Sequence, residues 1–432
     1  MARQRRAHAR IRRVSAEGVA RESLTAPAAP PPARTCDDAA VSAQEAGAKA
    51  PLPLAGVRVV EFCQIAAGPF CGMLLADMGA DVIKVEPPGG DAMRQWPPIT
   101  AGYSENFASV NRNKRSIALD LKAPDHKQVA LDLVASAQVL IENNRPGAMD
   151  RLGLGYADLC ALNRSLVYCS ISAFGHDGPR AGDGAFDVTM QAISGIMSVT
   201  GHENAPPVKC GVPVSDFATG LYAAFNVVAA ILRERATGLG CHIDASMLGC
   251  SLGIAALQTS EYFGTGVNPR KLGAAHPRNS PYEAYRASDD YFVIAAGNDK
   301  LWRSVCEIVD MLDLAGDARF DTTAKRARNQ ADLKVILEQR FATQSAATWL
   351  QRFTRAGVPC APINSYDAAL ADPQVLARGW VQPLTLPGGT QTRTFGAPVA
   401  MTGTDFTIRR PPPALDGDRD EIIKELWQGE RE

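Results

Sequence analysis

The chain has 432 residues, of which 46% are hydrophobic and 21% carry a charge. A chain of this length can bury a sizeable core and is expected to fold into two domains. No stretch approaches 18 consecutive apolar residues, so the sequence predicts no membrane-spanning helix and no membrane partner.

Residues 1–52 are predicted to form a disordered basic tail rich in Pro and Ala. Residues 1–35 contain eight Arg against two Glu, so the rest of the chain has an excess of seven acidic residues. A mildly acidic body argues against a nucleic-acid partner. An Arg-rich, acid-poor start is typical of a mitochondrial presequence, but few apolar residues are present to form an amphipathic face. We therefore expect a cytoplasmic protein, with the mitochondrial matrix as the alternative.

The ten cysteines and six histidines form no metal-binding pattern. No C-x-x-C or H-x-x-x-H pair occurs, and scattered cysteines indicate reduced thiols in a cytosol-like compartment. Cys63, Cys71, Cys169 and Cys250 lie in apolar runs and are expected to be small buried hydrophobic residues. The sequence predicts no metal.

Residues 57–62, 68–78 and 81–86 predict a strand–helix–strand unit, the opening of a doubly wound parallel sheet. Gly68-Pro69 marks the helix start. Glu86 ends the second strand, where nucleotide-binding folds place an acid that binds ribose. The turn before the helix lacks G-x-G-x-x-G, and no G-x-x-x-x-G-K-[ST] occurs, so a nicotinamide or flavin cofactor is disfavoured.

The alternation continues, and it predicts an α/β large domain over 53–250. Further strands are expected over 116–121, 139–142 and 166–171, and helices over 127–136, 188–198 and 221–235. Residues 251–372 are assigned to a linker and a smaller α+β domain, with a strand over 291–296 and helices over 300–312, 329–341 and 348–356. Residues 373–432, with a β-like run over 391–398, are expected to return to the large domain.

Asp216 is the candidate reactive residue. It lies in the run 210–220, which is predicted to be a strand or strand end just before the helix over 221–235. An acid at that position is either a helix N-cap or a reactive group facing a pocket. The local sequence alone leaves both readings open.

Basic and polar residues follow several predicted strands. They occur in 111–116, at Lys122, in 142–147 and at Arg151. Ligands of open α/β sheets bind outside the carboxyl ends of the strands. Several Arg and Lys at that edge suit a large anionic ligand with phosphates, although each cluster alone also fits a solvated basic face.

An ordered set of motifs resembles the class III CoA-transferases, the formyl-CoA:oxalate and carnitine CoA-transferase family, which also contains the α-methylacyl-CoA racemases. The pattern is most like the succinyl-CoA:glutarate (dicarboxylate) branch. The resemblance implies a Rossmann-like large domain, a smaller domain and an interlocked homodimer. It runs from about 54 to about 422, and the segments that carry it are 53–62, 67–69, 79–86, 111–117, 142–147, 153–156, 191–195, 211–216 and 411–413.

The resemblance also implies the site. Asp216 matches the family's catalytic aspartate, which forms an acyl–aspartyl anhydride and then an aspartyl-CoA thioester, with CoA as a substrate and no tightly bound cofactor. The implied CoA contacts are Ala66, Ala67, Leu119, Asp120, Leu121, Lys122, Asn143, Asn144, Arg145, Arg151, Phe186 and Asp187.

Three departures from the oxalate enzyme bear on the substrate. Ala66 stands where that enzyme has Gln, Pro87 stands where it has a CoA-contacting Arg, and 272–281 replaces its glycine-rich loop. The change at Ala66 argues against oxalate as a substrate. Candidates for binding the distal carboxylate of a dicarboxylic acid are Arg278, Arg270 and His276.

Two other functions fit part of the pattern. A racemase needs a His–Asp pair to move a proton. Asp187 matches the racemase aspartate, but Phe186 precedes it where racemases commonly have His, and no His occurs in 127–175. A CoA-binding protein without catalysis would keep the basic clusters but would not need Asp216. The sequence therefore predicts transfer of CoA from an acyl-CoA, such as succinyl-CoA, to a free carboxylic acid, such as a dicarboxylate, with racemisation as the alternative.

Overall fold

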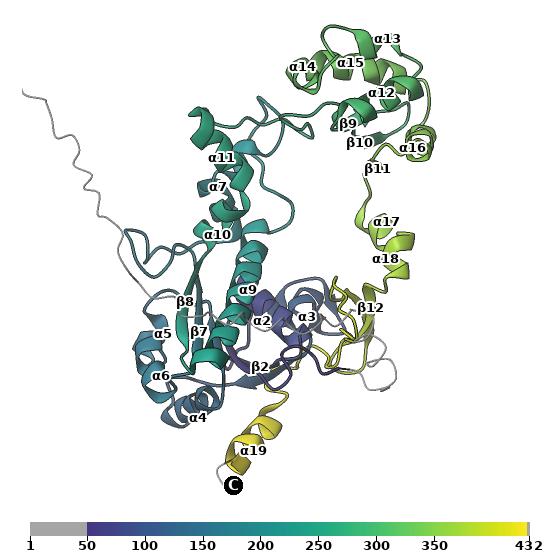
Figure 1. Ribbon diagram of the computed structural model, residues 1–432. Helices are drawn as coiled ribbons and strands as arrows, with labels where there is room; N and C mark the ends of the chain where they lie inside the picture. Colours follow the sequence, from purple (N-terminus) through teal and green to yellow (C-terminus); the bar gives the residue numbers. More distant parts are fainter. Residues whose placement is uncertain (1–49, 430–432) are drawn as a thin grey trace, which may run out of the picture. The chain divides into compact units, whose positions relative to one another are not determined.

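A computed structural model describes residues 50–429 of the chain, so nearly all of the predicted tail lies outside the described residues. Within that range the largest sheet has six parallel strands in the order β5-β2-β1-β6-β7-β8 (Figure 1). In chain order this is 3-2-1-4-5-6, the arrangement of a doubly wound sheet, and the predicted fold class is confirmed. The strands are β1 (Arg58–Phe62), β2 (Asp81–Glu86), β5 (Lys114–Ala118), β6 (Val139–Glu142), β7 (Val167–Ser172) and β8 (Cys241–Ser246).

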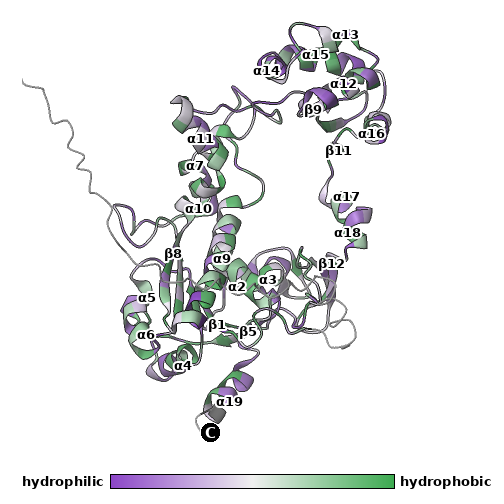
Figure 2. Ribbon diagram, in the orientation of Figure 1, coloured by the Kyte–Doolittle hydropathy of each residue, from purple (hydrophilic) through white to green (hydrophobic). Residues whose placement is uncertain are grey.

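The sheet is hydrophobic on both faces because helices cover both. In β1, Val59 packs under α2 (Ala67–Asp77) and α9 (Val214–Thr237), whereas Val60 and Phe62 face the opposite helices. The opposite face is covered by α4 (Pro124–Ala135), α5 (Ala148–Arg151), α6 (Tyr156–Leu162) and α19 (Arg419–Gly429). The strands β6 and β7 are accordingly largely apolar, whereas β1, β2 and β5 also carry buried charged residues. Helix α2, which packs on the sheet, is largely green in Figure 2.

Helix α9 begins seven residues earlier than the sequence predicted. The expected strand end over 210–220 is wrong: the helix runs over Val214–Thr237, so Asp216 lies in its first turn. The misleading signal is Gly220, which resembles a break but sits inside the helix. A Cβ at Gly220 would lie 2.8 Å from the Ala67 carbonyl oxygen, so glycine lets α9 approach α2 closely.

One helix in the described residues, α9, is long and apolar enough to cross a membrane by length and composition. The packing of α9 against the sheet explains this apolar composition without a membrane. Ala223, Val227 and Ile231 are buried against the sheet in the same cluster as Cys71 and Leu75 of α2. A core helix covered on one face by a sheet needs such an apolar sequence.

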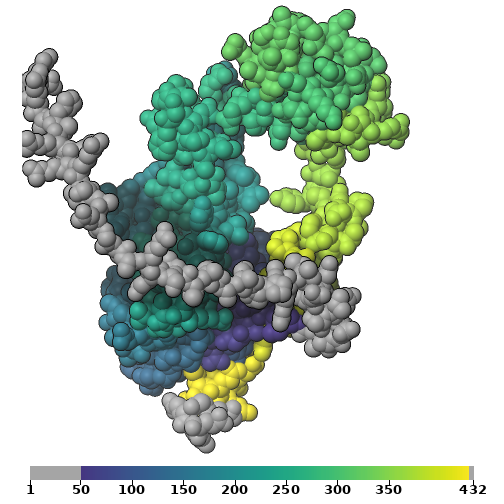
Figure 3. All heavy atoms as spheres, in the orientation of Figure 1, coloured from purple at the N-terminus to yellow at the C-terminus, as the bar shows by residue number. Residues whose placement is uncertain are grey.

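Residues 282–362 build a second, smaller α+β part with its own core. Its sheet has the order β11-β10-β9, all antiparallel, and the globule is the green region of Figure 3. The core is rich in aromatic residues, among them Phe292, Phe341 and Trp349, all fully buried. The elements are β9 (Tyr282–Arg286), β10 (Tyr291–Ala295), α12 (Asp299–Ile308), α13 (Asp313–Gly316), α14 (Thr323–Arg328), α15 (Gln330–Phe341), α16 (Ala346–Arg355) and β11 (Cys360–Pro362).

The last segment brings the chain back to the large sheet. Ile422 of α19 is buried in the cluster formed with β5 and α4, and Arg115 of β5 forms ion pairs with Glu421 and Glu425 of α19. The other elements in this segment are α17 (Tyr366–Leu370), α18 (Pro373–Ala377) and the hairpin of β12 (Val381–Thr385) and β13 (Gln391–Phe395).

The remaining predicted elements are confirmed or corrected at their boundaries. The strands over 81–86 and 139–142 are confirmed residue for residue. The helix expected over 188–198 is divided at Gly195, whose φ is 85°, into two helices. The short elements not yet named are η1 (Ala92–Gln95), β3 (Ile99–Thr100), β4 (Tyr103–Ser104), α3 (Glu105–Asn111), α7 (Asp187–Ile193), α8 (Ile196–Val199), α10 (Met247–Ile254) and α11 (Ala256–Thr265).

Candidate active site

A cavity of about 540 Å³, here called the Asp216 cavity, opens at the carboxyl end of the parallel sheet. Its walls come from turns that follow β1, β6 and β7, joined by the first turn of α9 and by the segment before α7. Ligands of doubly wound folds bind at this edge. The lining residues are 64–67, 143–146, 171–173, 183–186, Thr189, Asp216 and Met247.

A second hollow of about 200 Å³, here called the Lys122 cavity, adjoins the first, because Gln64 and Asn144 line both. It follows the ends of β2 and β5. Its other lining residues are Phe62, 85–88, 119–122, Met149 and Leu152. The two cavities therefore adjoin along the carboxyl edge of the sheet.

Asp216 is half-buried in the wall of its cavity, two residues after α9 begins at Val214. Burial raises the pKa of the Asp216 carboxyl to about 7, and the negative charge of Asp187 adds to the rise. A carboxyl group with such a pKa is typical of reactive positions. Asp216 does not cap the helix, because the N-cap residue is Pro213. Of the two roles that the sequence left open for Asp216, a helix N-cap and a reactive group facing a pocket, the structure therefore favours the reactive group.

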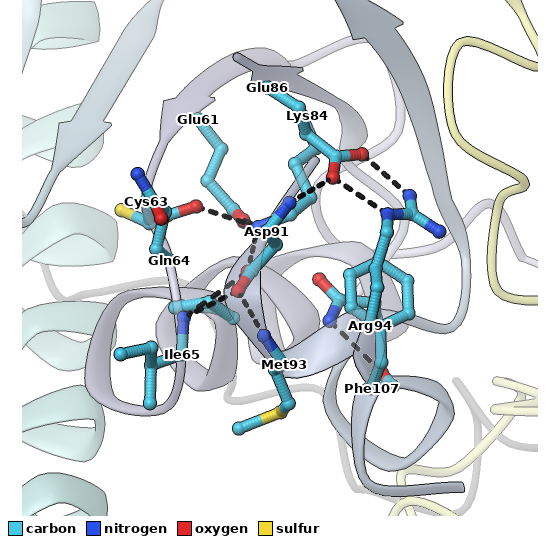
Figure 4. Close-up of polar contacts among 12 residues, drawn as sticks. Glu61, Cys63, Gln64, Ile65, Lys84, Glu86, Asp91, Met93, Arg94 and Phe107 are labelled. Carbon is cyan, nitrogen blue, oxygen red and sulfur yellow. Dashed lines mark hydrogen bonds and ion pairs between the residues drawn. The ribbon is translucent and has the colours of Figure 1, made fainter. Parts of the chain in front are cut away.

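The turn 64–67 that lines the Asp216 cavity is fixed by a buried network of charges, drawn in Figure 4. Ile65 has φ 67°, a conformation that a β-branched residue adopts only at a cost of about 1–3 kcal/mol. Its backbone N–H donates to both oxygens of Asp91, at 3.1 and 3.2 Å. Lys84 pairs with Asp91 at 3.0 Å and with Glu61 at 3.1 Å, and all three side chains are fully buried.

Asn143 links this turn to the end of β6. Its side-chain oxygen accepts a hydrogen bond from the Gln64 N–H at 2.9 Å, and its side-chain nitrogen donates to the Gln64 carbonyl at 2.8 Å. Asn144 is held in a similar way, because its N–H donates to Glu142 at 2.8 Å. The two asparagines therefore shape the cavity edge as well as lining it.

Most of the predicted contact residues come together around the two cavities. The Asp216 cavity is lined by the predicted residues Ala66, Ala67, Asn143, Asn144, Arg145 and Phe186, and the Lys122 cavity by Leu119, Asp120, Leu121 and Lys122. Arg151 lies on α5, exposed, between Met149 and Leu152, and lines neither cavity. Its role as a CoA contact stays a prediction.

Asp187 is not among the residues that line either cavity. Its Oδ1 accepts hydrogen bonds from the backbone N–H groups of Ser215 at 2.9 Å and Asp216 at 3.4 Å. Its Oδ2 accepts a hydrogen bond from Gln191 Nε2 at 2.7 Å. The carboxylate is therefore directed at the start of α9.

The carboxylate of Glu86, like that of Asp187, is engaged in hydrogen bonds within the protein. It lines the Lys122 cavity, but Arg94 binds both of its oxygens, at 2.6 and 2.8 Å, and the hydroxyl of Ser116 donates to it at 2.6 Å. A carboxylate engaged in this way does not present itself to a ribose, as the position in the sheet had suggested.

The three candidates for binding a distal carboxylate line neither cavity. Arg278 pairs with Glu261 at 3.3 Å and Arg270 with Glu203 at 3.5 Å. His276 accepts hydrogen bonds from the backbone N–H groups of residues 278 and 279. Arg145 is instead the basic side chain among the described residues that line the Asp216 cavity.

Sequence reasoning missed the residues that hold the site in place. Asp91 and Gln191 touch neither cavity, so no motif-based search for contacts selects them. Gln191 is fully buried, and it lies in a segment that carried the family resemblance, which is the one signal that pointed to it. Cys63, Cys71 and Cys169 are buried as expected, whereas Cys250 is half-buried.

Comparison with known proteins identifies the family. The model of CoA-transferase family III matches residues 54–419. The succinyl-CoA:glutarate CoA-transferase of Homo sapiens is 36% identical over 87% of this chain and 86% of that protein. The succinate–glutarate CoA-transferase of Agrobacterium fabrum is 38% identical over 88% of this chain and 97% of that one. The crystal structure of a CAIB/BAIF family protein from Brucella suis has a TM-score of 0.79 and 38% identity, covering 87% of this chain and all of that one. The chain therefore belongs to CoA-transferase family III, as its motifs predicted.

Proposed function

We propose that this protein transfers CoA from succinyl-CoA to a free dicarboxylic acid, with Asp216 as the covalent nucleophile. The observation that carries the proposal is the place of Asp216. Its carboxyl group lies in the wall of a cavity at the carboxyl end of the sheet, surrounded by residues that the family pattern assigns to CoA. The substrate class rests on the two glutarate CoA-transferases that resemble the chain over most of its length.

The chemistry is an exchange through two covalent intermediates. The Asp216 carboxylate attacks the thioester carbonyl of succinyl-CoA, which forms a succinyl–aspartyl anhydride and releases the CoA thiolate. The thiolate attacks the aspartyl carbonyl, which forms an aspartyl-CoA thioester and releases succinate. The acceptor carboxylate attacks this thioester to form a mixed anhydride, and the released thiolate attacks the acceptor carbonyl. The new acyl-CoA leaves and the Asp216 carboxylate is restored.

The surroundings of Asp216 suit this chemistry. Each attack develops negative charge on a carbonyl oxygen, which hydrogen-bond donors stabilise. Helix α2 begins at Ala67 on the cavity wall, and its N-cap residue Ala66 provides no side-chain cap. The backbone N–H groups of this first turn, at the positive end of the helix, are the donors that we assign to the developing oxyanion.

Arg145 supplies positive charge in the same cavity. No acidic partner of Arg145 occurs among the described ion pairs, so its guanidinium is available to an anionic substrate. Gly184 lies directly beneath it, since a Cβ there would lie 3.0 Å from Nη2. A planar guanidinium pairs well with either a carboxylate or a phosphate.

The racemase alternative has less support. A two-base mechanism needs a proton carrier on each side of the substrate. No histidine occurs among the described residues that line the Asp216 cavity, and the carboxylate of Asp187 is directed at α9. The acids that line the cavity are Asp216 and Asp183, and Asp183 is paired with Arg180, so no His–Asp pair faces the substrate.

We also propose that the protein works as a homodimer in the cytoplasm, as the family resemblance and the composition predicted. Large apolar side chains are exposed along α9 and α11, including Phe225 and Phe263, which are 71% and 82% exposed. A patch of this kind favours burial against another chain. Sedimentation of the purified protein tests the dimer, and a monomer at micromolar concentration would contradict it.

The decisive experiment incubates the protein with succinyl-CoA and a panel of free acids (glutarate, itaconate, malate, mesaconate, oxalate and acetate). Mass spectrometry then detects new CoA esters and any mass added to the Asp216 peptide. We expect a dicarboxylyl-CoA product and a modified Asp216 peptide. Loss of α-deuterium from a branched acyl-CoA without ester formation would instead establish the racemase function.

A further inference from the structure

The first turn of α9 is held by two other helices. Helix α7 provides Asp187, whose Oδ1 accepts the N–H groups of Ser215 at 2.9 Å and Asp216 at 3.4 Å. Helix α10 provides Ser251, whose hydroxyl donates to Ser215 Oγ at 2.9 Å, and both serines are fully buried. Helix N-termini need acceptors for their free N–H groups, and here the acceptor comes from a different helix.

A second link fixes Asp187 itself. Gln191, one turn further along α7, is fully buried and donates to Asp187 Oδ2 at 2.7 Å. The oxygen of the same Gln191 amide accepts the N–H of Cys210 at 2.8 Å. A continuous path of hydrogen bonds therefore runs from the segment before α9, through Gln191 and Asp187, to the backbone of Asp216.

We propose that Asp187 is a positioning residue for the transfer reaction, which anchors the first turn of α9 and so fixes the carboxylate of Asp216 in the cavity. This inference rests on the proposed function of Asp216. It also gives a different role to Asp187 from the CoA contact that the family pattern implied, because its two oxygens are engaged by Gln191 and by the start of α9.

Asp187 also affects the charge state of Asp216. The charged or titratable side chains near the first turn of α9 are Asp187 on α7, Cys250 on α10, and Arg145 and Asp183 on the cavity edge, while the first turn of α2 carries no acid. Of these, Asp187 is the group whose charge raises the pKa of Asp216. Removing that negative charge favours ionisation of Asp216 at a lower pH.

The test is the pH dependence of kcat/KM for CoA transfer in Asp187→Asn. We expect the acidic limb, near pH 7 in the unmodified protein, to move down by about one pH unit. The plateau should fall by up to about tenfold, because a less basic carboxylate is a weaker nucleophile. A structural role alone would lower the rate without moving the limb. A limb that stays within a few tenths of a unit would overturn the proposal.

Asp158→Asn is the matched control. Asp158 lies in the first turn of α6, lines neither cavity and should leave the profile unchanged. An equal movement of the limb in this variant would also overturn the proposal.

Gln191→Met distinguishes two effects of Asp187: the anchoring of the first turn of α9 and the influence of its charge on the pKa of Asp216. It keeps the carboxyl group of Asp187 but removes the amide that holds it, so kcat should fall severalfold while the acidic limb stays in place. This variant carries the test if Asp187→Asn does not fold, and an unchanged kcat would then refute the anchoring role of Asp187.

The mass added to the Asp216 peptide distinguishes a failure of the proposed function from a failure of the proposed role of Asp187. Its absence in the unmodified protein refutes the proposed function, whereas its presence with an unmoved limb refutes only the role of Asp187.

Discussion

At the scale of single residues, Asp216 combines two properties that usually oppose each other. It lies in the first turn of a helix, where the positive end of the helix favours an ionised carboxylate, yet burial and Asp187 raise its pKa to about 7. A carboxylate with this pKa is a better nucleophile than an exposed aspartate and is still substantially ionised at neutral pH.

The raised pKa carries a stability cost with a definite sign. The folded protein binds the Asp216 proton more tightly than the unfolded chain does, so this group makes the protein less stable as pH rises from about 4 to about 7. Asp216→Asn should therefore be more stable than the unmodified protein at pH 8, by about 1–3 kcal/mol, with a smaller difference at pH 5. Urea unfolding at the two pH values measures this. Equal stabilities at pH 8 would contradict the raised pKa.

Replacing Asp216 should lower activity, although it raises stability. Asp216→Ala should abolish ester exchange, because the nucleophile is removed and Asp183, the other carboxylate of the cavity wall, is paired with Arg180, while binding of CoA stays nearly intact. Product analysis by mass spectrometry and calorimetric titration with CoA provide the two readouts. Full exchange activity in this variant would exclude the covalent mechanism.

At the scale of secondary structure elements, the site depends on how closely α9 approaches α2. Gly220 sits four residues after Asp216, and a Cβ there would lie 2.8 Å from the Ala67 carbonyl oxygen and 2.9 Å from Phe70 Cδ1. One of these atoms belongs to the backbone and cannot move aside. Because Gly220 has no side chain, α9 and α2 can approach closely enough for their first turns to border the same cavity.

Gly220→Ala should separate the two helices. We expect a loss of about 1–3 kcal/mol in the free energy of unfolding and a raised KM for the acyl-CoA. The control is Gly264→Ala on α11, where a Cβ would meet nothing within 4 Å. That change should be neutral or slightly stabilising. Denaturant unfolding and steady-state kinetics distinguish the variants, and similar behaviour of the two would show that the close approach is unimportant.

The turn 64–67 depends on the buried charges in a similar way. Lys84→Met would leave Asp91 buried without its cation and Glu61 paired with Lys114 alone, and the expected loss is about 3–5 kcal/mol. Arg270→Met removes an exposed pair with Glu203 and should cost at most about 1 kcal/mol. Urea unfolding of both variants compares the two costs. A loss below 1 kcal/mol in Lys84→Met would mean that the network does not hold the turn.

At the scale of the whole molecule, the end of the chain stabilises its beginning. Arg115 is nearly buried on β5 and binds Asp81 of β2 at 2.6 Å and Glu425 of α19 at 2.8 Å. Ile422 fills the core between β5 and α4. Residues more than 300 positions apart therefore share one cluster, which closes the large sheet at its β5 edge.

Arg115→Ala should release α19. The variant removes the buried cation that Asp81, Glu421 and Glu425 share and leaves them only the more exposed Arg58 and Arg410. We therefore expect a loss of about 2–4 kcal/mol and rapid proteolytic removal of the C-terminal helix. Arg410→Ala is the control, because Arg410 binds Glu421 in a half-exposed pair worth at most about 1 kcal/mol. Limited proteolysis followed by mass spectrometry locates the cleavage. Equal protection of α19 in both variants would contradict this view.

The sequence by itself determined the parallel α/β fold and the family and predicted the nucleophile, because strand patterns and short motifs are local properties. The strands over 81–86 and 139–142 and the polar turns that follow them are examples. Only the tertiary structure decided the start of α9 and the hydrogen-bond partners of Asp187. Gly220 is compatible with a helix because α2 passes beside it, and the partners of Asp187 are backbone groups 28 and 29 residues away. Such partners are selected by packing of helices on a sheet, which no local pattern encodes.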